Sequence, residues 1–192
     1  MSTRDRILDA AAAVLRERGI ARATTKEIAR AAGCSEALLY KHFTDKQELF
    51  LGVLSERAPR LDEPADLVGR ATVAENVTTL VGQLLAFYAR SFPMAASILG
   101  APELLVAHRE GLGRRGAGPH GPALQLQAYL DAEVRDGRLA ADVDTEATAR
   151  TLAGAALFEA FLATYAGLDA VPDAAARARR IAGAVRLGAP TT

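Results

Sequence analysis

The sequence has little that would tie it to an oxidising compartment, a metal or a membrane. A single cysteine, Cys34, excludes an internal disulfide framework and predicts a reducing, cytoplasmic setting. The three histidines, His42, His108 and His120, do not combine with it in the spacing of a zinc site, so we expect no metal and no cofactor. No apolar run approaches the ~20 residues that a membrane helix needs, and the first twenty residues are charged throughout, unlike a secretory signal. We therefore expect a soluble protein without a membrane partner.

Catalytic patterns are also missing, and we expect no enzyme. The sequence has no nucleophile elbow, and no Ser or Cys stands with a His in a recognisable signature. Residues 111–116, GLGRRG, formally match the dinucleotide fingerprint, which requires a preceding strand and a helix that starts within it. A helical pattern precedes the match, and a further glycine, two prolines and a histidine follow it. This composition predicts an irregular surface loop over 111–122.

The charges balance overall but are unevenly distributed. The chain of 192 residues has 23 basic and 23 acidic side chains. Residues 1–60 carry a net charge of +3, the remainder carries −3, and all three lysines (Lys26, Lys41, Lys46) fall within 21 residues. A basic N-terminal part on a neutral body suits a small DNA-reading domain. Chance clustering in an arginine-biased composition is the alternative.

Helical periodicity dominates the chain, and no alternating strand pattern is convincing. Thr3 is the expected N-cap of the first helix and Gly19 its stop, while Thr24 with Glu27 has the spacing of a capping box. Asp45 and Glu48 have the same spacing. Helices are predicted over about 3–19, 24–32, 35–43, 45–57, 72–92, 123–136, 145–166 and 174–187, with a shorter helical pair in 94–110.

Residues 24–50, TTKEIARAAGCSEALLYKHFTDKQELF, indicate a helix-turn-helix. Two short helices flank Gly33, which can adopt a positive φ without a Cβ clash. In this arrangement the second helix lies in the major groove, with its N-terminal residues against the base edges.

The run of matches around this motif resembles the TetR family of bacterial repressors. The resemblance covers positions 4–54, and Cys34 and Leu38 depart from the commonest pattern. It is carried by Thr24–Thr25, Ile28–Ala29, Ala32–Gly33, Ser35, Leu39–Tyr40, Phe43, Lys46 and Leu49. It implies an all-α protein with an N-terminal three-helix DNA-binding domain (1–61) and a larger helical effector-binding and dimerisation domain (62–192).

The chemistry of the motif assigns expected DNA contacts. Lys46 starts the fourth helix and suits a phosphate, and Thr25 or Ser35 can donate to one. The resemblance implies that Tyr40 and His42 bond the DNA backbone. The expected base-reading residues are Glu36, Ala37, Leu38 and Lys41. Of these, Glu36 can accept from cytosine N4, Leu38 can contact a thymine methyl, and Lys41 can reach guanine O6 or N7. For Glu36 the alternative is an exposed acid that favours the helix dipole.

The larger half is expected to dimerise and to bind an effector. Residues 145–166 are apolar nearly all round, which requires burial on more than one side, and the resemblance implies that the last two helices pair across a dimer. Expected interface residues are Gly154, Ala155, Phe158, Ile181 and Val185. Expected lining residues of a largely apolar effector pocket are Phe87, Phe92, Met94, Phe158, Phe161 and Tyr165. Plain core is the alternative for these aromatics, and an exposed position is the alternative to a pocket position for Glu159.

Together these features predict a homodimeric, ligand-responsive repressor of a palindromic DNA operator, which a small molecule releases by a population shift. One alternative is a helical small-molecule-binding protein or enzyme whose N-terminal motif no longer binds DNA. Another is a purely structural dimerisation module.

Overall fold

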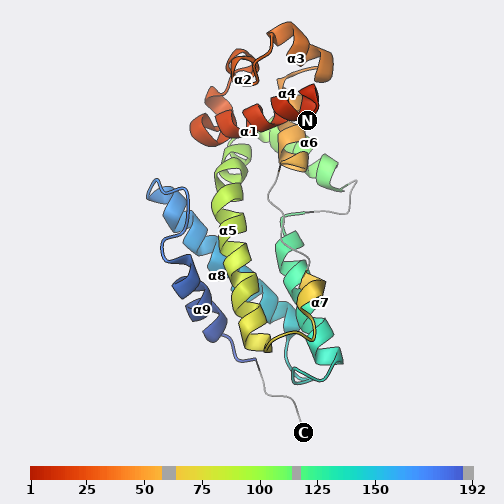
Figure 1. Ribbon diagram of the computed structural model, residues 1–192, viewed down its shortest axis with the longest axis vertical. Helices are drawn as coiled ribbons and strands as arrows, with labels where there is room; N and C mark the ends of the chain where they lie inside the picture. Colours follow the sequence, from red (N-terminus) through yellow and green to blue (C-terminus); the bar gives the residue numbers. More distant parts are fainter. Residues whose placement is uncertain (58–63, 114–117, 188–192) are drawn as a thin grey trace. The chain divides into compact units, whose positions relative to one another are not determined.

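The structure is built from helices joined by short connections (Figure 1). The computed structural model describes residues 1–57, 64–113 and 118–187, and within these ranges there is no strand, so the all-α prediction is confirmed. The elements are α1 (Thr3–Arg22), α2 (Thr25–Ala31), α3 (Glu36–His42), α4 (Lys46–Glu56), the 3₁₀ turn η1 (Pro64–Leu67), α5 (Val73–Leu99), α6 (Pro102–Gly113), α7 (Gly121–Arg135), α8 (Thr145–Tyr165) and α9 (Ala174–Gly183).

The chain forms two compact units. The first comprises Met1–Pro59 and Pro93–Gly118, and the second comprises Arg60–Phe92 and Pro119–Thr192. The predicted boundary between residues 61 and 62 does not reproduce this division, since Pro93–Gly118 belongs to the first unit, and the two predicted functional domains stay a prediction. The centre of the predicted 111–122 loop, and with it half of the declined nucleotide motif, lies outside the described residues, as does the start of the link near 59–70. The loop prediction is wrong at both ends, because α6 continues to Gly113 and α7 begins at Gly121.

A continuous apolar core holds α1 to α4 together in the first unit. Leu8, Ile28, Leu39 and Val53, one from each helix, are all fully buried in it. The core also includes Met94, Ile98 and Leu104 from the end of α5 and from α6. Every helix of the predicted motif is therefore fixed by side chains on its inner face.

The core of the second unit contains a buried polar cluster. The apolar part comes from α5, α7, α8 and α9. Leu85 on α5, Leu130 on α7 and Leu152 on α8 are fully buried in it. Glu133 on α7 is 0% exposed and forms an ion pair of 3.3 Å with Arg138. The Asn76 amide on α5 donates to the carbonyl oxygens of Leu67 (2.9 Å) and Arg70 (3.2 Å), and Arg138 also donates to that of Arg70 (3.0 Å). These bonds join the turn before α5 to the end of α7.

Several helix ends differ from the sequence-based expectation. The first N-cap is Ser2 rather than Thr3, because Ser2 and Asp5 complete a capping box. The Thr24–Glu27 box is confirmed. Asp45 caps the amide of Glu48, but the Glu48 carboxylate accepts from the amide of Thr44 instead of that of Asp45.

Three predicted helix ends are wrong, and one is that of the last helix, which ends at Gly183 instead of about residue 187. Gly19 has a φ of +71° and kinks α1, which then continues to Arg22. Helix α5 does not end at Pro93 but passes through it to Leu99. A proline removes one amide donor and strains one turn of a helix, but burial of Met94 and Ile98 in the core beyond it offsets this cost.

The capping box at Ser2 makes a testable contribution to acid stability. Hydrogen bonds from the Ser2 hydroxyl, and then from Arg57, lower the pKa of Asp5 to about 2. A carboxylate whose pKa is lower in the folded state stabilises the fold above its unfolded pKa of about 3.9, and this contribution is lost as the pH falls toward 2. We expect Asp5→Asn to lower the melting temperature at neutral pH and the difference from wild type to vanish near pH 2. Thermal unfolding followed by circular dichroism across this range checks it; a difference that persists at the acid end would contradict it.

Candidate DNA-binding surface

The turn between α2 and α3 fixes how α3 leaves the first unit. Gly33 has a φ of +65°, its amide donates to Arg30 (3.1 Å), and the amide of Cys34 donates to Ala29 (2.9 Å). These two bonds are those of a Schellman motif, in which a left-handed glycine ends one helix and redirects the chain. Ser35 then caps α3 by accepting from the amide of Leu38 (3.1 Å). The predicted roles of Gly33 in the turn and of Ser35 as a cap are confirmed.

Helix α3 buries one side and presents the other to solvent. Leu39 and, at the C-cap, Phe43 are buried in the core of the first unit. The predicted contact residues lie on the remaining surface: Glu36, Ala37, Tyr40 and Lys41 are exposed, and Leu38 and His42 are half-buried. A helix held in this way offers a row of short and long polar groups of the kind that enters a major groove.

Three of the predicted contact residues are joined by hydrogen bonds. The Thr25 hydroxyl on α2 donates to a carboxylate oxygen of Glu36 at 2.6 Å, and the Tyr40 hydroxyl lies 3.3 Å from the same Thr25 oxygen. Thr25 is half-buried, whereas Glu36 and Tyr40 are exposed. The cluster therefore links the start of α2 to two successive turns of α3.

Arg4, Arg18 and Arg57 form the described ion pairs of the first unit, while its other arginines and its lysines form none among the described residues. Every ion pair among the described residues uses an arginine, and none uses a lysine. Arg4 binds both carboxylate oxygens of Glu56 at 2.7 Å, and Arg57 binds Asp5 and Asp9. Lys46 starts α4, and its ammonium group lies 5.1 Å from the centre of the Phe50 ring.

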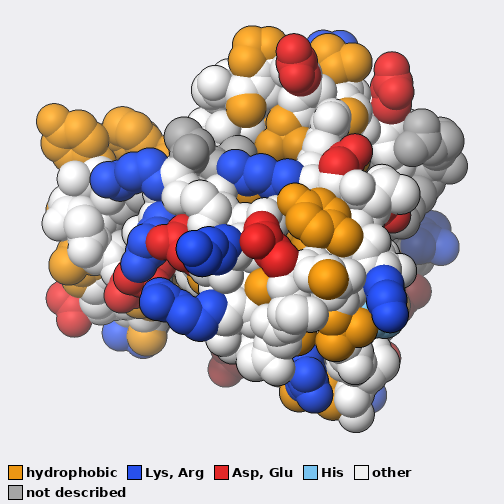
Figure 2. Space-filling model, turned by 90° about the horizontal axis from the view of Figure 1, so that it is seen from above, with side chains coloured by type: hydrophobic (Ala, Val, Ile, Leu, Met, Phe, Trp, Pro, Cys, Tyr) orange, Lys and Arg blue, Asp and Glu red, His pale blue; other side chains and the backbone are white. Residues whose placement is uncertain are grey.

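On the face of the protein shown in Figure 2, Lys and Arg side chains lie among acidic ones. Lys26, Lys41 and Lys46 take part in none of the described ion pairs and are, like the exposed Arg6, Arg16, Arg22 and Arg30, available to a phosphate.

The structure does not bring the predicted effector-pocket residues around one cavity. Met94 lies in the core of the first unit, whereas Phe87 is half-buried in the second, with its ring against Tyr88. The other four form a surface chain of ring contacts, in which Phe161 touches Phe92, Phe158 and Tyr165 at centroid distances of 5.8, 6.3 and 6.1 Å.

These rings belong to an exposed apolar strip on α8. We define the α8 strip as Gly154, Leu157, Phe158, Phe161, Leu162 and Tyr165. Phe158 is 58% exposed and Tyr165 is 84% exposed. The opposite side of α8, with Leu152 and Ala156, is fully buried. Leu157 and Leu162 were not among the predicted site residues, although the sequence pattern places Leu162 on the same side as Phe158 and Tyr165.

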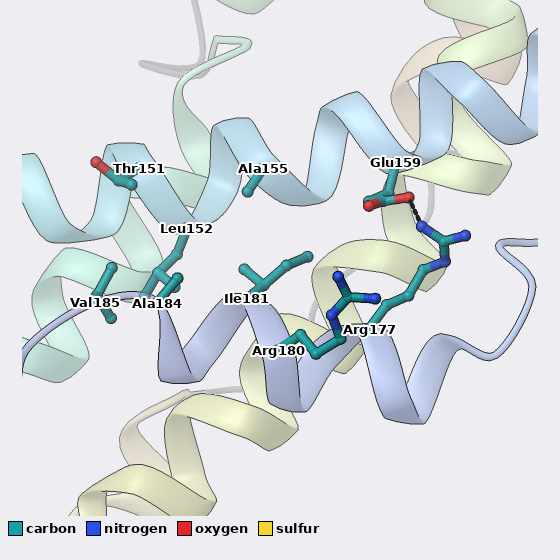
Figure 3. A pocket seen from close by; sticks show the side chains of 9 residues that line it. All are labelled: Thr151, Leu152, Ala155, Glu159, Arg177, Arg180, Ile181, Ala184 and Val185. Atoms are coloured by element: carbon teal, nitrogen blue, oxygen red, sulfur yellow. Dashed lines mark hydrogen bonds and ion pairs between the residues drawn. The ribbon is translucent and has the colours of Figure 1, made fainter.

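A groove lies beside the strip, between α8 and α9 (Figure 3). It has a volume of about 280 Å³ and is lined by Thr151, Leu152, Ala155, Glu159, Arg177, Arg180, Ile181, Ala184 and Val185. Ala155 points from α8 toward α9, and Ile181 points from α9 toward α8. Glu159 pairs with Arg177 across the groove. Three of the predicted interface residues, Ala155, Ile181 and Val185, thus line this groove, while Gly154 and Phe158 lie on the α8 strip.

No described helix is long and apolar enough to cross a membrane. Nor does any group of three or more His, Cys, Asp or Glu side chains in the described ranges have an arrangement that could hold a metal ion.

Comparison with known proteins gives matches in both parts of the chain. Residues 7–53 match the family described as "Bacterial regulatory proteins, tetR family". Residues 114–188 match the family described as "AefR-like transcriptional repressor, C-terminal domain".

Individual relatives and solved structures agree with these matches. An uncharacterized HTH-type transcriptional regulator of Bacillus subtilis, YvkB, is 45% identical over 56 residues, or 29% of this chain and 30% of the relative. The nucleoid occlusion factor SlmA of Vibrio cholerae is 34% identical over 114 residues, or 55% of each chain. The chain thus spans less than two thirds of the length of either relative.

The fold matches over a longer range. A putative TetR-family transcriptional regulator from Mesorhizobium loti superimposes with a TM-score of 0.77 over 95% of this chain and 94% of the other, at 19% identity. From the two family matches and the helix-turn-helix geometry, together with this shared fold, the chain belongs to the TetR family of bacterial regulatory proteins.

Proposed function

We propose that this protein is a transcriptional repressor that binds a palindromic operator as a homodimer and leaves it when a small molecule binds. The observation that carries the DNA-binding part is the pattern of exposure on α3. Its inner residues are fixed in the core, and its outer residues are the hydrogen-bonding groups expected to meet bases and phosphates. The match of residues 114–188 to a repressor domain supports repression.

Dimerisation is supported by the α8 strip. Large contiguous apolar surfaces are rare on monomeric proteins and mark interaction sites. Five of the exposed large hydrophobic side chains lie within residues 157–165. A second copy that covers this strip and the adjacent groove would remove it from water, and two recognition helices are what a palindrome requires. The predicted burial of this helix on more than one side is thereby completed by the partner.

The effector part of the proposal places the ligand in the second unit. Besides the groove between α8 and α9, a second cavity of about 660 Å³ lies between the start of α5 and the end of α9. It is lined by Ala74, Thr78, Arg179, Ala182, Gly183, Val185, Arg186 and Leu187. An effector whose affinity differs by about 1–3 kcal/mol between the DNA-binding and the released conformation suffices for release. A small-molecule screen by thermal shift, followed by DNA titration with each hit, tests this part separately.

The experiment that tests the central proposal is selection of bound duplexes from a random pool with the purified full chain. We expect a palindromic consensus and binding that weakens steeply with salt. A protein that enriches no sequence and binds no duplex in dilute buffer would instead match the alternative of a small-molecule-binding protein or enzyme without DNA affinity.

Lys46→Ala is expected to weaken binding to all duplexes by a similar factor. Removal of one phosphate contact lowers the slope of log K against log salt by about 0.9 and leaves the consensus unchanged. Fluorescence polarisation at several salt concentrations measures both. Arg135→Ala, which removes an exposed charge from α7 in the second unit, is the matched control. Equal slopes for Lys46→Ala and wild type would show that Lys46 does not contact a phosphate.

A further inference from the structure

In the cluster of Thr25, Glu36 and Tyr40, the Thr25 hydroxyl is the only donor that faces the carboxylate. It donates to Glu36 at 2.6 Å, a short bond to a charged acceptor, and the Tyr40 hydroxyl lies 3.3 Å from its oxygen. No other hydrogen bond of the Glu36 side chain occurs among the described residues. The carboxylate, which is exposed at the first residue of α3, thus depends on Thr25 for its one protein donor.

The number of protons in this cluster limits what it can do on DNA. A threonine hydroxyl carries one hydrogen, and a phosphate can only accept. While Thr25 donates to Glu36, it has no hydrogen for a phosphate, and the Tyr40 hydroxyl donates to the Thr25 oxygen. A phosphate that accepts from Thr25 must therefore displace the Glu36 carboxylate, and a phosphate near Thr25 and Tyr40 is also repelled by that charge.

We infer that Glu36 is a specificity-determining residue that acts by opposing the backbone contact of Thr25 and Tyr40, unless a base donor takes over its carboxylate. This inference rests on the proposed DNA-binding function. In the major groove the exposed amino donors are those of cytosine N4 and adenine N6. Where one of these amino groups meets the first turn of α3, the Glu36 carboxylate accepts a hydrogen bond from the base instead of from Thr25. The Thr25 hydroxyl then donates to the phosphate. Where neither amino group is present, the Glu36 carboxylate keeps its hydrogen bond from Thr25 and repels the phosphates of the duplex.

This mechanism predicts that loss of the Glu36 charge strengthens binding to the wrong DNA. We expect Glu36→Gln and Glu36→Ala to bind random duplex roughly three- to tenfold more tightly than wild type in dilute buffer. The gain should shrink as salt rises. In the selected consensus, the preference for cytosine or adenine at one position of each half-site should be lost. Fluorescence polarisation and duplex selection measure these effects. Unchanged random-duplex affinity together with an unchanged consensus would overturn the inference.

Two controls separate the hydrogen-bond exchange from a general effect of charge. Glu17→Gln removes an equivalent charge from α1, where the carboxylate is 74% exposed, and should leave random-duplex affinity at the wild-type value. In a Thr25→Val background, the gain from Glu36→Gln should be largely lost, because no hydroxyl remains to be released. A full gain in that background, or an equal gain from Glu17→Gln, would show repulsion at a distance and would overturn the proposed exchange.

The outcomes also distinguish this inference from the proposed function. If wild type binds no duplex and enriches no consensus, the DNA-binding proposal itself fails. If wild type enriches a palindrome while the Glu36 variants behave as wild type, only the role of Glu36 fails.

Discussion

Phe158→Asp is expected to leave the protein monomeric and to lower its affinity for a palindromic site by about 100-fold or more. Phe158 is 58% exposed on the α8 strip, and its ring stacks on that of Phe161. A carboxylate at this position would be buried by the second copy without a partner, which is costly. The loss on DNA is large because each monomer then engages one half-site without the local concentration supplied by the other.

Sedimentation and DNA titration of the same samples check this result. Leu124→Asp is the matched control, because Leu124 is also an exposed apolar residue, 52% accessible, but lies on α7 outside the α8 strip. Binding of wild type and Phe158→Asp to a single half-site should be alike. A Phe158→Asp protein that remains a dimer with full operator affinity would refute the proposed interface.

Phe43→Ala is expected to destabilise the first unit by about 3–5 kcal/mol, the usual cost of deleting a large buried ring. Phe43 is 1% exposed, follows directly after α3, and lies beneath the Arg4 guanidinium at 5.1 Å from the ring centre. Because whole domains are stable by only about 5–15 kcal/mol, this loss should unfold the first unit, and abolish DNA binding, at a lower temperature than in wild type. The dimer should persist, since the α8 strip belongs to the other unit.

Urea unfolding followed by circular dichroism measures the stability, and sedimentation measures the dimer. Phe87→Ala deletes the same atoms from a half-buried position in the second unit. It should leave operator binding intact under conditions where Phe43→Ala has lost it. Full operator affinity of Phe43→Ala at unchanged stability would contradict the assigned role of this ring.

The first unit was predictable because its signals are local. A cap such as Thr24, a glycine turn at Gly33 and an apolar inner face each act within a few residues, and the structure has them at the expected positions. The wrong helix ends in this unit also have local causes. Ser2 stands beside Thr3 as a second possible N-cap, and the hydrogen bond lost at Pro93 predicts a helix end there although core contacts lie beyond it.

The arrangement of the second unit was less predictable because several apolar faces compete for burial. An aromatic residue at helical spacing suits a pocket, a core or an interface equally well, and the rings of α8 lie on the surface of the single chain. The burial of Glu133 could be predicted from the sequence, since Glu133 continues the inward-facing stripe of Leu126 and Leu130 on α7. The hydrogen bond from Thr25 to Glu36 could not be predicted from the sequence, because it joins two helices whose relative position is set only by the folded turn between them.

That no lysine takes part in the described ion pairs has a practical consequence for chemical modification. Guanidinium groups do not react with reagents that acylate amines, so the cross-links from Arg4 and Arg57 to their carboxylates would survive such treatment. The amines of Lys26, Lys41 and Lys46 would be neutralised, and the +3 charge of residues 1–60 would fall to zero. Acylation would therefore remove the net positive charge of residues 1–60 without breaking the ion pairs of Arg4 and Arg57.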